Sequence, residues 1–213
     1  MLEVQNLIKD YENKPLLKGV SFTVDKGQLV CLLGASGSGK STVLRIIAGL
    51  EEPQSGAVLW QGQDLRDTPT HKRGFGLMFQ DYALFPHKTV AQNIAFGLQM
   101  QRLPEDEIAQ RVRAGLESIR MQSFADRPVT ELSGGEQQKV SIGRALVREA
   151  PILLMDEPST YLDHASQAEI IELIRTIQLK HHLTLIMISH DPEHLEAMSD
   201  RILLLKNGRL EER

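Results

Sequence analysis

The segment 34–41 has the residue types and spacing of a phosphate-binding loop. It fits the pattern G-x-x-x-x-G-K-[ST] at every fixed position, as Gly34-Ala35-Ser36-Gly37-Ser38-Gly39-Lys40-Ser41. The apolar run Leu29–Leu33 precedes it and a helical pattern, Thr42–Ala48, follows, which is the context that such a loop requires. Glycines let backbone N–H groups point at a phosphate, the Lys40 ammonium adds charge, and the Ser41 hydroxyl can bind Mg²⁺. We therefore predict that this segment and Thr42 bind a nucleotide.

Two adjacent carboxylates follow another apolar run, Ile152–Met155. In a parallel α/β sheet, ligands lie outside the carboxyl ends of the strands. Asp156 is then placed to reach Mg²⁺, directly or through water, and Glu157 to polarise a water molecule for in-line attack on a γ-phosphate. Without the phosphate-binding loop, Asp156-Glu157-Pro158 would read as an ordinary acidic turn. Together with the loop, the pair favours phosphoryl chemistry.

Gln80 and His190 stand at the ends of two further apolar runs, Gly76–Phe79 and Thr184–Ser189. A glutamine there can coordinate Mg²⁺ or hold water, and a histidine can donate a hydrogen bond to a γ-phosphate oxygen. The chain contains seven histidines, so an ordinary hydrogen-bonded strand-end residue is the alternative for His190. Its position relative to the other motifs favours the catalytic interpretation.

A second glycine turn, formed by Ser133, Gly134 and Gly135, precedes the helical pattern Glu136–Val147. Backbone N–H groups at a helix N-terminus, together with the helix dipole, attract anions. The alternative is a glycine-rich helix cap without a ligand. The chain thus has two places suited to a phosphate group, far apart in the sequence.

The arrangement of the predicted elements indicates an α/β fold with a mostly parallel sheet, because nearly continuous apolar runs alternate with helical patterns such as Ala168–Ile177. The alternating runs Val20–Val24 and Ala57–Trp60 suggest an antiparallel flank on that sheet. Residues 87–148 contain helical patterns and no convincing strand. We therefore predict a single domain over 1–213, with an α/β core from 1–86 and 149–213 and a helical subdomain from 87–148. The expected helices of the subdomain are Ala91–Met100, Glu105–Met121 and Glu136–Val147, and the fifth expected core strand is Ile202–Leu205.

Composition limits the remaining function classes. The 213 residues are 41% hydrophobic and 24% charged, with a net charge of −4, which gives no support for binding nucleic acid. The single cysteine, Cys31, rules out an intrachain disulfide and fits a reducing compartment. The N-terminal residues lack the pattern of a signal peptide, and no apolar run approaches the length of about 18 residues that a membrane span needs. Any role at a membrane is expected to require a partner.

Taken together, the motifs resemble those of the ATP-binding subunits of ABC transporters. The matching parts are GASGSGKS, the Gln80 loop, LSGGE, ILLMDEP, the segment from Ser159 to Asp163, and ISHD around His190. They have the family's order and spacing and cover essentially the whole chain. The resemblance implies a P-loop NTPase fold, ATP and Mg²⁺ as cofactors and ATPase activity. It also implies that Tyr11 stacks on adenine, although a strand-edge tyrosine is an ordinary alternative.

The same resemblance explains the two glycine turns. In this family two copies meet head to tail, with ATP sandwiched between the P-loop of one copy and the Ser-Gly-Gly turn of the other. Ser133, Gly134 and Gly135 would hold the γ-phosphate of the partner's ATP, and Asp163 would also act across the dimer. The sequence departs from the family pattern at Glu136, where Gln is commonest, and at Lys139 and Tyr161. None of these departures removes a catalytic group.

The segment Phe79–His87 resembles that of importers for iron(III), polyamines, thiamine, sulfate and sugars. The implied partners are integral membrane permease subunits and, indirectly, a solute-binding protein, at the cytoplasmic face of the membrane. Tyr82, Leu84 and Phe85 would form a groove for a permease helix or, alternatively, the core of the helical lobe. Many such importers carry a C-terminal regulatory domain. Because the sequence ends at Arg213, soon after its last predicted strand, we expect that this chain lacks such a domain or that the domain was removed.

Other function classes fit less well. An exporter subunit and a soluble ABC-type ATPase remain alternatives to an importer. Translation factors of the soluble kind carry two cassettes, and the stretch between Gln80 and Leu132 is too short for the coiled coil of repair ATPases. A regulatory module without turnover would be expected to lack Glu157 or His190, and a small-molecule kinase has no use for LSGGE. The transported solute is not specified by the sequence.

Overall fold

The computed structural model describes residues 1–12, 14–189 and 198–212, which fall into two compact units. The first unit consists of Met1–Leu77, Pro151–Glu157 and Gln178–Arg213, and the second of Met78–Ala150 and Pro158–Ile177. The helical subdomain predicted for 87–148 lies within the second unit, which also takes in 158–177; the predicted boundaries stay a prediction.

A six-stranded sheet in the order β10-β9-β3-β8-β7-β6 dominates the first unit. β3 pairs in parallel with β8 and β9, β8 pairs in parallel with β7, and β10 returns antiparallel to β9. The mostly parallel sheet is therefore confirmed, and its five predicted strands have ends within one residue of those observed, whereas β10 was not predicted. The strands are β3 (Leu29–Leu33), β6 (Gly76–Met78), β7 (Ile152–Asp156), β8 (Thr184–Ile188), β9 (Arg201–Lys206) and β10 (Arg209–Glu212).

Four further strands of the first unit form a separate, antiparallel sheet in the order β2-β1-β4-β5. The sequence predicted only parts of two of its strands and missed β1, because the alternation of buried residues in β1 is interrupted. Asn6 has a φ of 48° and the register shifts between Val4 and Leu7, so apolar residues on either side do not follow a simple period of two. The strands are β1 (Leu2–Tyr11), β2 (Lys14–Val24), β4 (Ser55–Trp60) and β5 (Gln63–Asp64).

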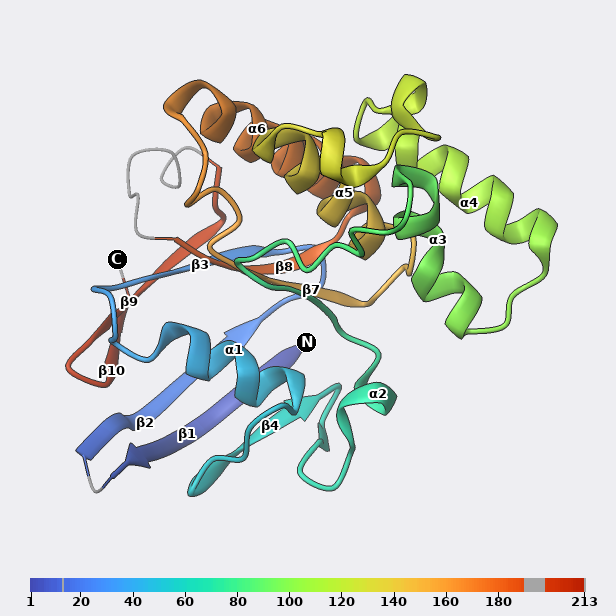
Figure 1. The fold of residues 1–213 in the computed structure, drawn as a ribbon. Helices are drawn as coiled ribbons and strands as arrows, with labels where there is room; N and C mark the ends of the chain where they lie inside the picture. Colours follow the sequence, from blue (N-terminus) through green and yellow to red (C-terminus); the bar gives the residue numbers. More distant parts are fainter. Residues whose placement is uncertain (13, 190–197, 213) are drawn as a thin grey trace. The chain divides into compact units, whose positions relative to one another are not determined.

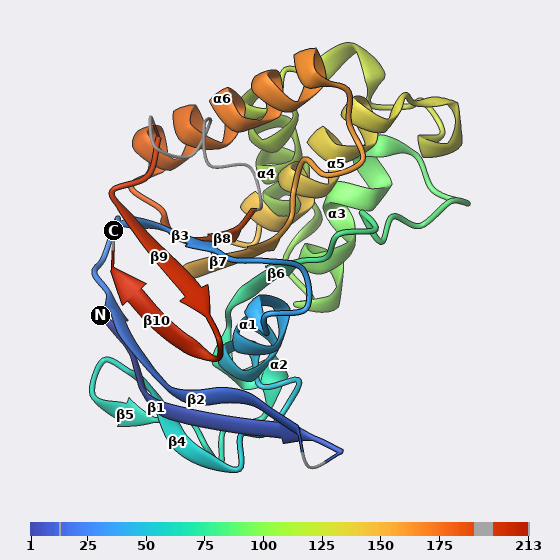
Figure 2. The same ribbon diagram turned by 90° about the vertical axis from the view of Figure 1, so that its left-hand side faces the viewer.

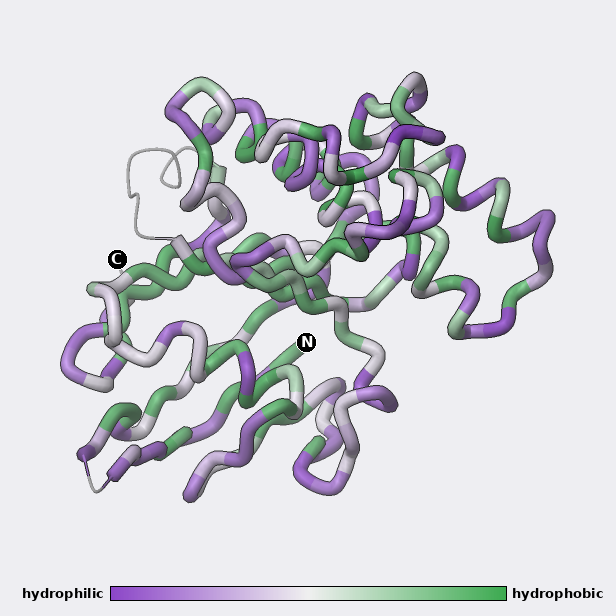
Figure 3. Tube along the Cα trace, in the orientation of Figure 1, coloured by the Kyte–Doolittle hydropathy of each residue, from purple (hydrophilic) through white to green (hydrophobic). Residues whose placement is uncertain are grey.

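Helix α1 (Lys40–Ala48) lies between the two sheets (Figures 1 and 2). Its residues Val43, Leu44, Ile46 and Ile47 are buried in one apolar core with side chains from both sheets. Burying each such side chain stabilises the fold by about 1.5–3 kcal/mol. Figure 3, coloured by hydropathy, shows that β3, β7 and β8 are largely hydrophobic. The core thus fixes the helix that follows the phosphate-binding loop.

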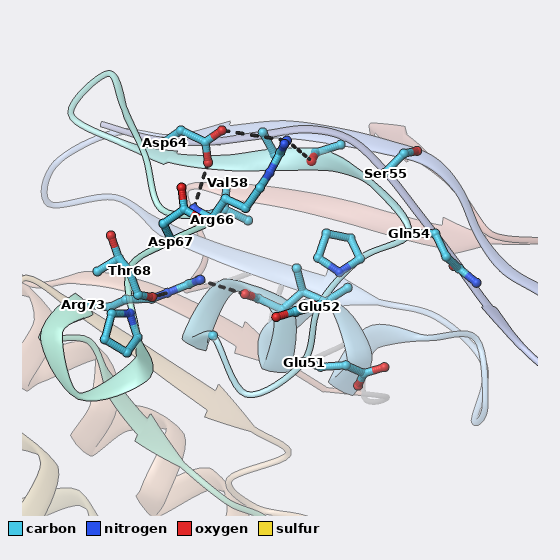
Figure 4. A pocket seen from close by; sticks show the side chains of 16 residues that line it. Glu51, Glu52, Gln54, Ser55, Val58, Asp64, Arg66, Asp67, Thr68 and Arg73 are labelled. Atoms are coloured by element: carbon cyan, nitrogen blue, oxygen red, sulfur yellow. Dashed lines mark hydrogen bonds and ion pairs between the residues drawn. The ribbon is translucent and has the colours of Figure 1, made fainter.

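The C-terminal end of α1 is held by one arginine. Gly49 ends the helix in a left-handed conformation, and Arg73, the last residue of α2 (Thr70–Arg73), donates hydrogen bonds to the carbonyls of Ile46 at 3.0 Å and Ile47 at 2.8 Å. It also bonds the carbonyls of Leu65 and Thr68. A cation at a helix C-terminus satisfies open carbonyls and complements the dipole. A cavity of about 680 Å³, lined in part by Arg66 and Arg73, adjoins this place (Figure 4).

We expect Arg73→Ala to lower the free energy of unfolding by about 2–4 kcal/mol, because it removes a charged donor from four main-chain carbonyls at once. Arg66→Ala is the matched control, because Arg66 lines the same cavity but is exposed. Its guanidinium forms a long ion pair with the Asp64 carboxylate, with 3.9 Å between the nitrogen and the oxygen. An exposed ion pair of that kind contributes about 0–1 kcal/mol. Urea denaturation of the two variants checks this, and equal losses of stability would contradict the capping role of Arg73.

The second unit is helical. It contains α3 (Val90–Met100), α4 (Glu105–Ser118), α5 (Gly134–Leu146), two short 3₁₀ turns (Gln122–Phe124 and Val129–Glu131) and α6 (His164–His181) up to Ile177. Close approach of helices explains a glycine inside α5, because a Cβ on Gly143 would lie 2.8 Å from the Ile119 side chain. Among the helices that the structure describes, none has the length and apolar character to cross a membrane.

For the predicted subdomain 87–148, two helix boundaries differ by two or more residues from the structure. α4 ends at Ser118 rather than at Met121, because Arg120 takes a left-handed φ of 58° that interrupts the helix. α5 begins at Gly134 rather than at Glu136, because Ser133 caps the helix and places both glycines in its first turn.

Candidate active site

The loop before α1 requires its glycines. Gly37 and Gly39 have φ angles of 75° and 103°, in the left-handed region that favours glycine. A Cβ on Gly34 would lie 2.5 Å from the carbonyl oxygen of Leu205, which no side chain could tolerate. Ala35 and Ser36, between these glycines, are exposed. The chain can therefore wrap its backbone closely around a ligand at this point.

Lys40 brings a buried positive charge to the loop. Its side chain is 5% exposed, and the ammonium donates hydrogen bonds to the carbonyls of Gly34 at 2.8 Å and Ala35 at 3.0 Å. Gly39, the N-cap residue of α1, has no side chain that could cap the helix, and the first turn of α1 has no acidic residue. The buried Ser38 hydroxyl has no hydrogen-bond partner among the described residues. Open N–H groups, an unpaired hydroxyl and a fixed cation suit an anion such as a phosphate group.

The structure brings Ser41 and Asp156 together. The Ser41 hydroxyl donates a hydrogen bond to Oδ1 of Asp156 at 3.0 Å, which joins the start of α1 to the end of β7. Burial raises the pKa of Asp156, the Glu157 charge raises it further, and the Ser41 hydrogen bond opposes both. The described residues contain no cluster of three or more His, Cys, Asp or Glu side chains that could hold a metal ion. One hydroxyl and one carboxylate still fit Mg²⁺, which takes few protein ligands beside phosphates and water.

Glu157 follows β7 in an unusual backbone conformation. Its φ is 49°, in the left-handed region, and its N–H donates a hydrogen bond to the Ile188 carbonyl at 3.2 Å. A non-glycine residue keeps this conformation only where its surroundings enforce it, and such residues concentrate at functional sites. The role of Glu157 in activating water stays a prediction.

Tyr11 ends β1 and is 44% exposed. Its hydroxyl donates a hydrogen bond to Glu51, and the ammonium of Lys9 lies 5.4 Å from the centre of its ring. Burial, followed by the hydrogen bond to Glu51, raises the pKa of Tyr11. Glu51 was not predicted as a partner of Tyr11, because none of its sequence neighbours marks it as a partner for a residue 40 positions away. The ring is held in place and partly open, as stacking on a base would need.

Two predicted catalytic residues are not placed at this site by the structure. Gln80 is half-buried in the turn after β6 and belongs to the second unit, so its approach to Ser41 and Asp156 stays a prediction. His190 lies outside the described residues.

Tyr82, Leu84 and Phe85, the residues predicted to form a groove or the core of the helical lobe, are half-buried, and the Phe85 ring packs on Phe96 with centroids 4.3 Å apart.

The second glycine turn is a well-formed helix N-terminus. Ser133 caps α5, its N–H donates to the Glu136 carboxylate at 2.8 Å, and its hydroxyl donates to the same carboxylate at 2.9 Å. These hydrogen bonds hold the pKa of Glu136 below its usual value. Asp163 plays a similar part for α6 by accepting bonds from the N–H groups of Ala165 and Ser166, both at 3.1 Å. Their predicted roles across a dimer stay predictions.

A phosphate-binding loop between a buried strand and a helix, beside an acidic strand end, is the defining arrangement of a P-loop NTPase domain. Residues 17–160 match the family described as ABC transporter. The chain belongs to the ABC transporter family, and the resemblance drawn from its motifs is confirmed.

Curated relatives match along the whole chain. The spermidine/putrescine import ATP-binding protein PotA of Haemophilus influenzae is 40% identical over 210 residues, 99% of this chain and 56% of that protein. The putrescine transport ATP-binding protein PotG of Escherichia coli is 42% identical over 213 residues, which cover 98% of this chain and 55% of PotG. The chain therefore spans little more than half the length of these relatives.

Solved structures confirm the fold. One is cbiO1 from Clostridium perfringens, part of the ABC transporter complex cbiONQ, with a TM-score of 0.91, 31% identity, and coverage of 99% of this chain and 86% of that one. Another is the ATP-binding cassette MJ0796, solved as a dimer in a post-hydrolysis state with ADP and Pi, with a TM-score of 0.87 and 30% identity. It covers 100% of this chain and 98% of that chain.

Proposed function

We propose that this chain is an ATP-hydrolysing domain that energises solute import through a separate membrane permease. The observation that carries the proposal is the Ser41–Asp156 hydrogen bond beside the buried Lys40, because it brings a cation, a hydroxyl and a carboxylate to one helix N-terminus. These are the groups that bind a nucleoside triphosphate with Mg²⁺. The naming of relatives as import ATP-binding proteins supports the direction of transport.

Each predicted residue then has a task. Lys40 and the N–H groups from Gly34 to Thr42 hold the phosphates, and the Tyr11 ring stacks on adenine. Ser41 and Asp156 hold Mg²⁺, with Gln80 as a further ligand; the ion, when bound, neutralises charge on the phosphate oxygens. Glu157 accepts a proton from the attacking water, and His190 steadies the γ-phosphate.

Binding of the γ-phosphate also gives a reason for two copies of the chain to form a dimer. A one-sided cradle leaves the γ-phosphate open to water, whereas the N-terminus of α5 supplies donors for the other side. We propose that Ser133, Gly134 and Gly135 bind the γ-phosphate of ATP held by a second copy, with Asp163 in the same interface. The dimer of MJ0796 with ADP and Pi supports this arrangement.

The partners and the place of action follow from this proposal. Permease subunits would receive the movement of the dimer, a solute-binding protein would deliver the solute to them, and the chain would lie at the cytoplasmic face of the membrane. PotA is named for the import of spermidine and putrescine and PotG for the transport of putrescine. Solute contacts in such a system are expected in other subunits, so the proposal extends to import and not to a particular solute.

Gly134→Ala tests the proposal at its least obvious point. A Cβ there would lie 3.4 Å from the nearest side-chain atom, of Leu162, so the variant should fold with unchanged or slightly higher stability. We expect the added methyl group to hinder the approach of a phosphate group to the N–H groups of the helix N-terminus. We expect ATP to bind a single copy normally, while ATP-driven dimer formation fails and hydrolysis falls by about 10-fold or more. Light scattering and phosphate release with MgATP measure both effects.

Gly97→Ala is the matched control, because it adds a methyl group to a helix of the same unit where only the flexible Arg148 side chain must move. It should leave dimer formation and hydrolysis unchanged. If Gly134→Ala still formed an ATP-dependent dimer with normal hydrolysis, the proposed role of the α5 N-terminus would be wrong.

A further inference from the structure

The segment between β6 and α3 contains two consecutive residues in a left-handed conformation. Tyr82 has a φ of 58° and Ala83 a φ of 46°, although neither is glycine. The Ala83 N–H donates a hydrogen bond to the Asp81 carbonyl at 2.6 Å, so the turn is also tight. Such a conformation persists only when surrounding groups enforce it. The turn begins directly after Gln80 and Asp81, so whatever holds it also limits where Gln80 can stand.

Helix α5 supplies the groups that hold this turn. The Arg144 guanidinium donates one hydrogen bond to the Ala83 carbonyl at 2.6 Å and another to the Tyr82 carbonyl at 2.8 Å. The Ser141 hydroxyl donates a third, to the Tyr82 carbonyl at 3.2 Å. The planar fork of arginine binds both carbonyls in one fixed orientation, which a lysine could not do. In Figure 1 the segment lies alongside α5, in agreement with these contacts.

The neighbouring parts of the segment are fixed as well. Downstream, the Asn93 side chain is 0% exposed, accepts the Phe85 N–H at 2.8 Å and donates to the Phe85 carbonyl at 3.2 Å. Upstream, the Gln138 amide of α5 lies 3.9 Å from the Met78 sulfur. The turn is therefore held from both sides along the chain, by Asn93 after it and by Gln138 before it.

The three residues of α5 that reach this segment lie on one face of the helix. Gln138, Ser141 and Arg144 are spaced three apart, so their side chains stack along the same side. They contact the segment on both sides of Gln80, at Met78 and at the turn. Helix α5 thus holds the backbone on both sides of Gln80 within the second unit.

We infer that Arg144, assisted by Ser141, is a positioning residue that holds Gln80 in place for its part in Mg²⁺ binding and hydrolysis. This inference rests on the proposed function. Arg144 acts through the backbone of Tyr82 and Ala83 and has no contact with nucleotide or metal in this role. The same helix begins at the Ser133–Gly135 turn, so one rigid element carries both the helix N-terminus and the support of Gln80.

The test compares Arg144→Gln with Arg111→Gln. Arg111 is also a helical arginine of the second unit, but it forms ion pairs with Glu107 at 2.7 Å and Glu149 at 3.2 Å away from the turn. For Arg144→Gln we expect kcat to fall about 10-fold or more, the Mg²⁺ concentration for half-maximal rate to rise several-fold, and ATP affinity in EDTA to stay unchanged. Arg144→Lys should recover part of the rate, and Arg111→Gln should match the parent protein.

Hydrogen exchange without nucleotide gives a readout that does not depend on hydrolysis. Amides of residues 81–84 should exchange at least about 10-fold faster in Arg144→Gln, while the Phe85 amide, which donates to Asn93, changes less. Ser141→Ala removes a single hydrogen bond and serves if Arg144→Gln does not fold. It should shift rate, Mg²⁺ dependence and exchange in the same directions by about 2–5-fold.

The outcomes separate the two hypotheses. A folded Arg144→Gln protein with the parent kcat and Mg²⁺ dependence overturns the inference and leaves the proposed function intact. Absence of MgATP hydrolysis in the parent protein overturns the proposed function. In that case, faster exchange at the turn still supports the positioning role of Arg144, and unchanged exchange overturns it. Unchanged behaviour of Ser141→Ala in every readout also counts against it.

Discussion

Glu157→Gln should reduce ATP hydrolysis by about 10²–10⁴-fold while leaving ATP and Mg²⁺ bound, because it removes the group proposed to accept a proton from water. The change is nearly isosteric and keeps the backbone bond to Ile188. It also removes the Glu157 charge, which is one of the causes that raise the pKa of Asp156. With binding intact and hydrolysis blocked, the ATP-bound dimer should accumulate.

Size-exclusion chromatography with MgATP measures that accumulation, and phosphate release measures the rate. Glu117→Gln, which removes one charge from an exposed position on α4, is the control and should behave as the parent protein. If Glu157→Gln eluted only as a monomer with ATP, or hydrolysed ATP at the parent rate, the proposed role of Glu157 would have to be abandoned.

Lys40→Ala should act earlier, at nucleotide binding. Lys40 is buried at the N-terminus of α1, and its ammonium is held within the loop by the carbonyls of Gly34 and Ala35. Charge-assisted hydrogen bonds contribute about 1.5–3 kcal/mol each, so loss of the ammonium should weaken ATP binding by about 100-fold or more. Hydrolysis would disappear as a consequence.

Titration with a fluorescent ATP analogue checks this prediction. Lys26→Ala is the control, since Lys26 is an exposed lysine in a turn of the same unit and its loss should leave affinity unchanged. An affinity for ATP within about 3-fold of the parent value in Lys40→Ala would show that the loop does not bind phosphate through this side chain.

The sequence predicted those parts of the site whose residues are contiguous. The loop from Gly34 to Ser41 and the pair Asp156-Glu157 each carry their own structural context, a buried strand on one side and a helix or turn on the other. Their meeting, in the Ser41–Asp156 hydrogen bond, follows from the parallel order of β3, β8 and β7. Pattern and topology together were therefore sufficient for this part of the site.

Features that depend on distant or strained residues were not predictable. The left-handed turn at Tyr82 and Ala83 has no glycine to mark it, and its support by Arg144 comes from a helix 61 residues further along the chain. The bond between Tyr11 and Glu51 is likewise long-range, and strand β1 is concealed by its irregularity at Asn6. In each case a tertiary interaction determines the local structure, and the local residue preferences do not indicate it.

The placement of Cys31 in β3 has a practical consequence. It is the only cysteine of the chain, its side chain is 0% exposed, and burial raises the pKa of its thiol to about 12. The native protein therefore presents almost no thiolate to alkylating reagents at neutral pH. Two cysteines introduced on the surface would therefore be the only reactive thiols, so a pair of spectroscopic labels attached to them could follow nucleotide-driven movements without removal of the native cysteine.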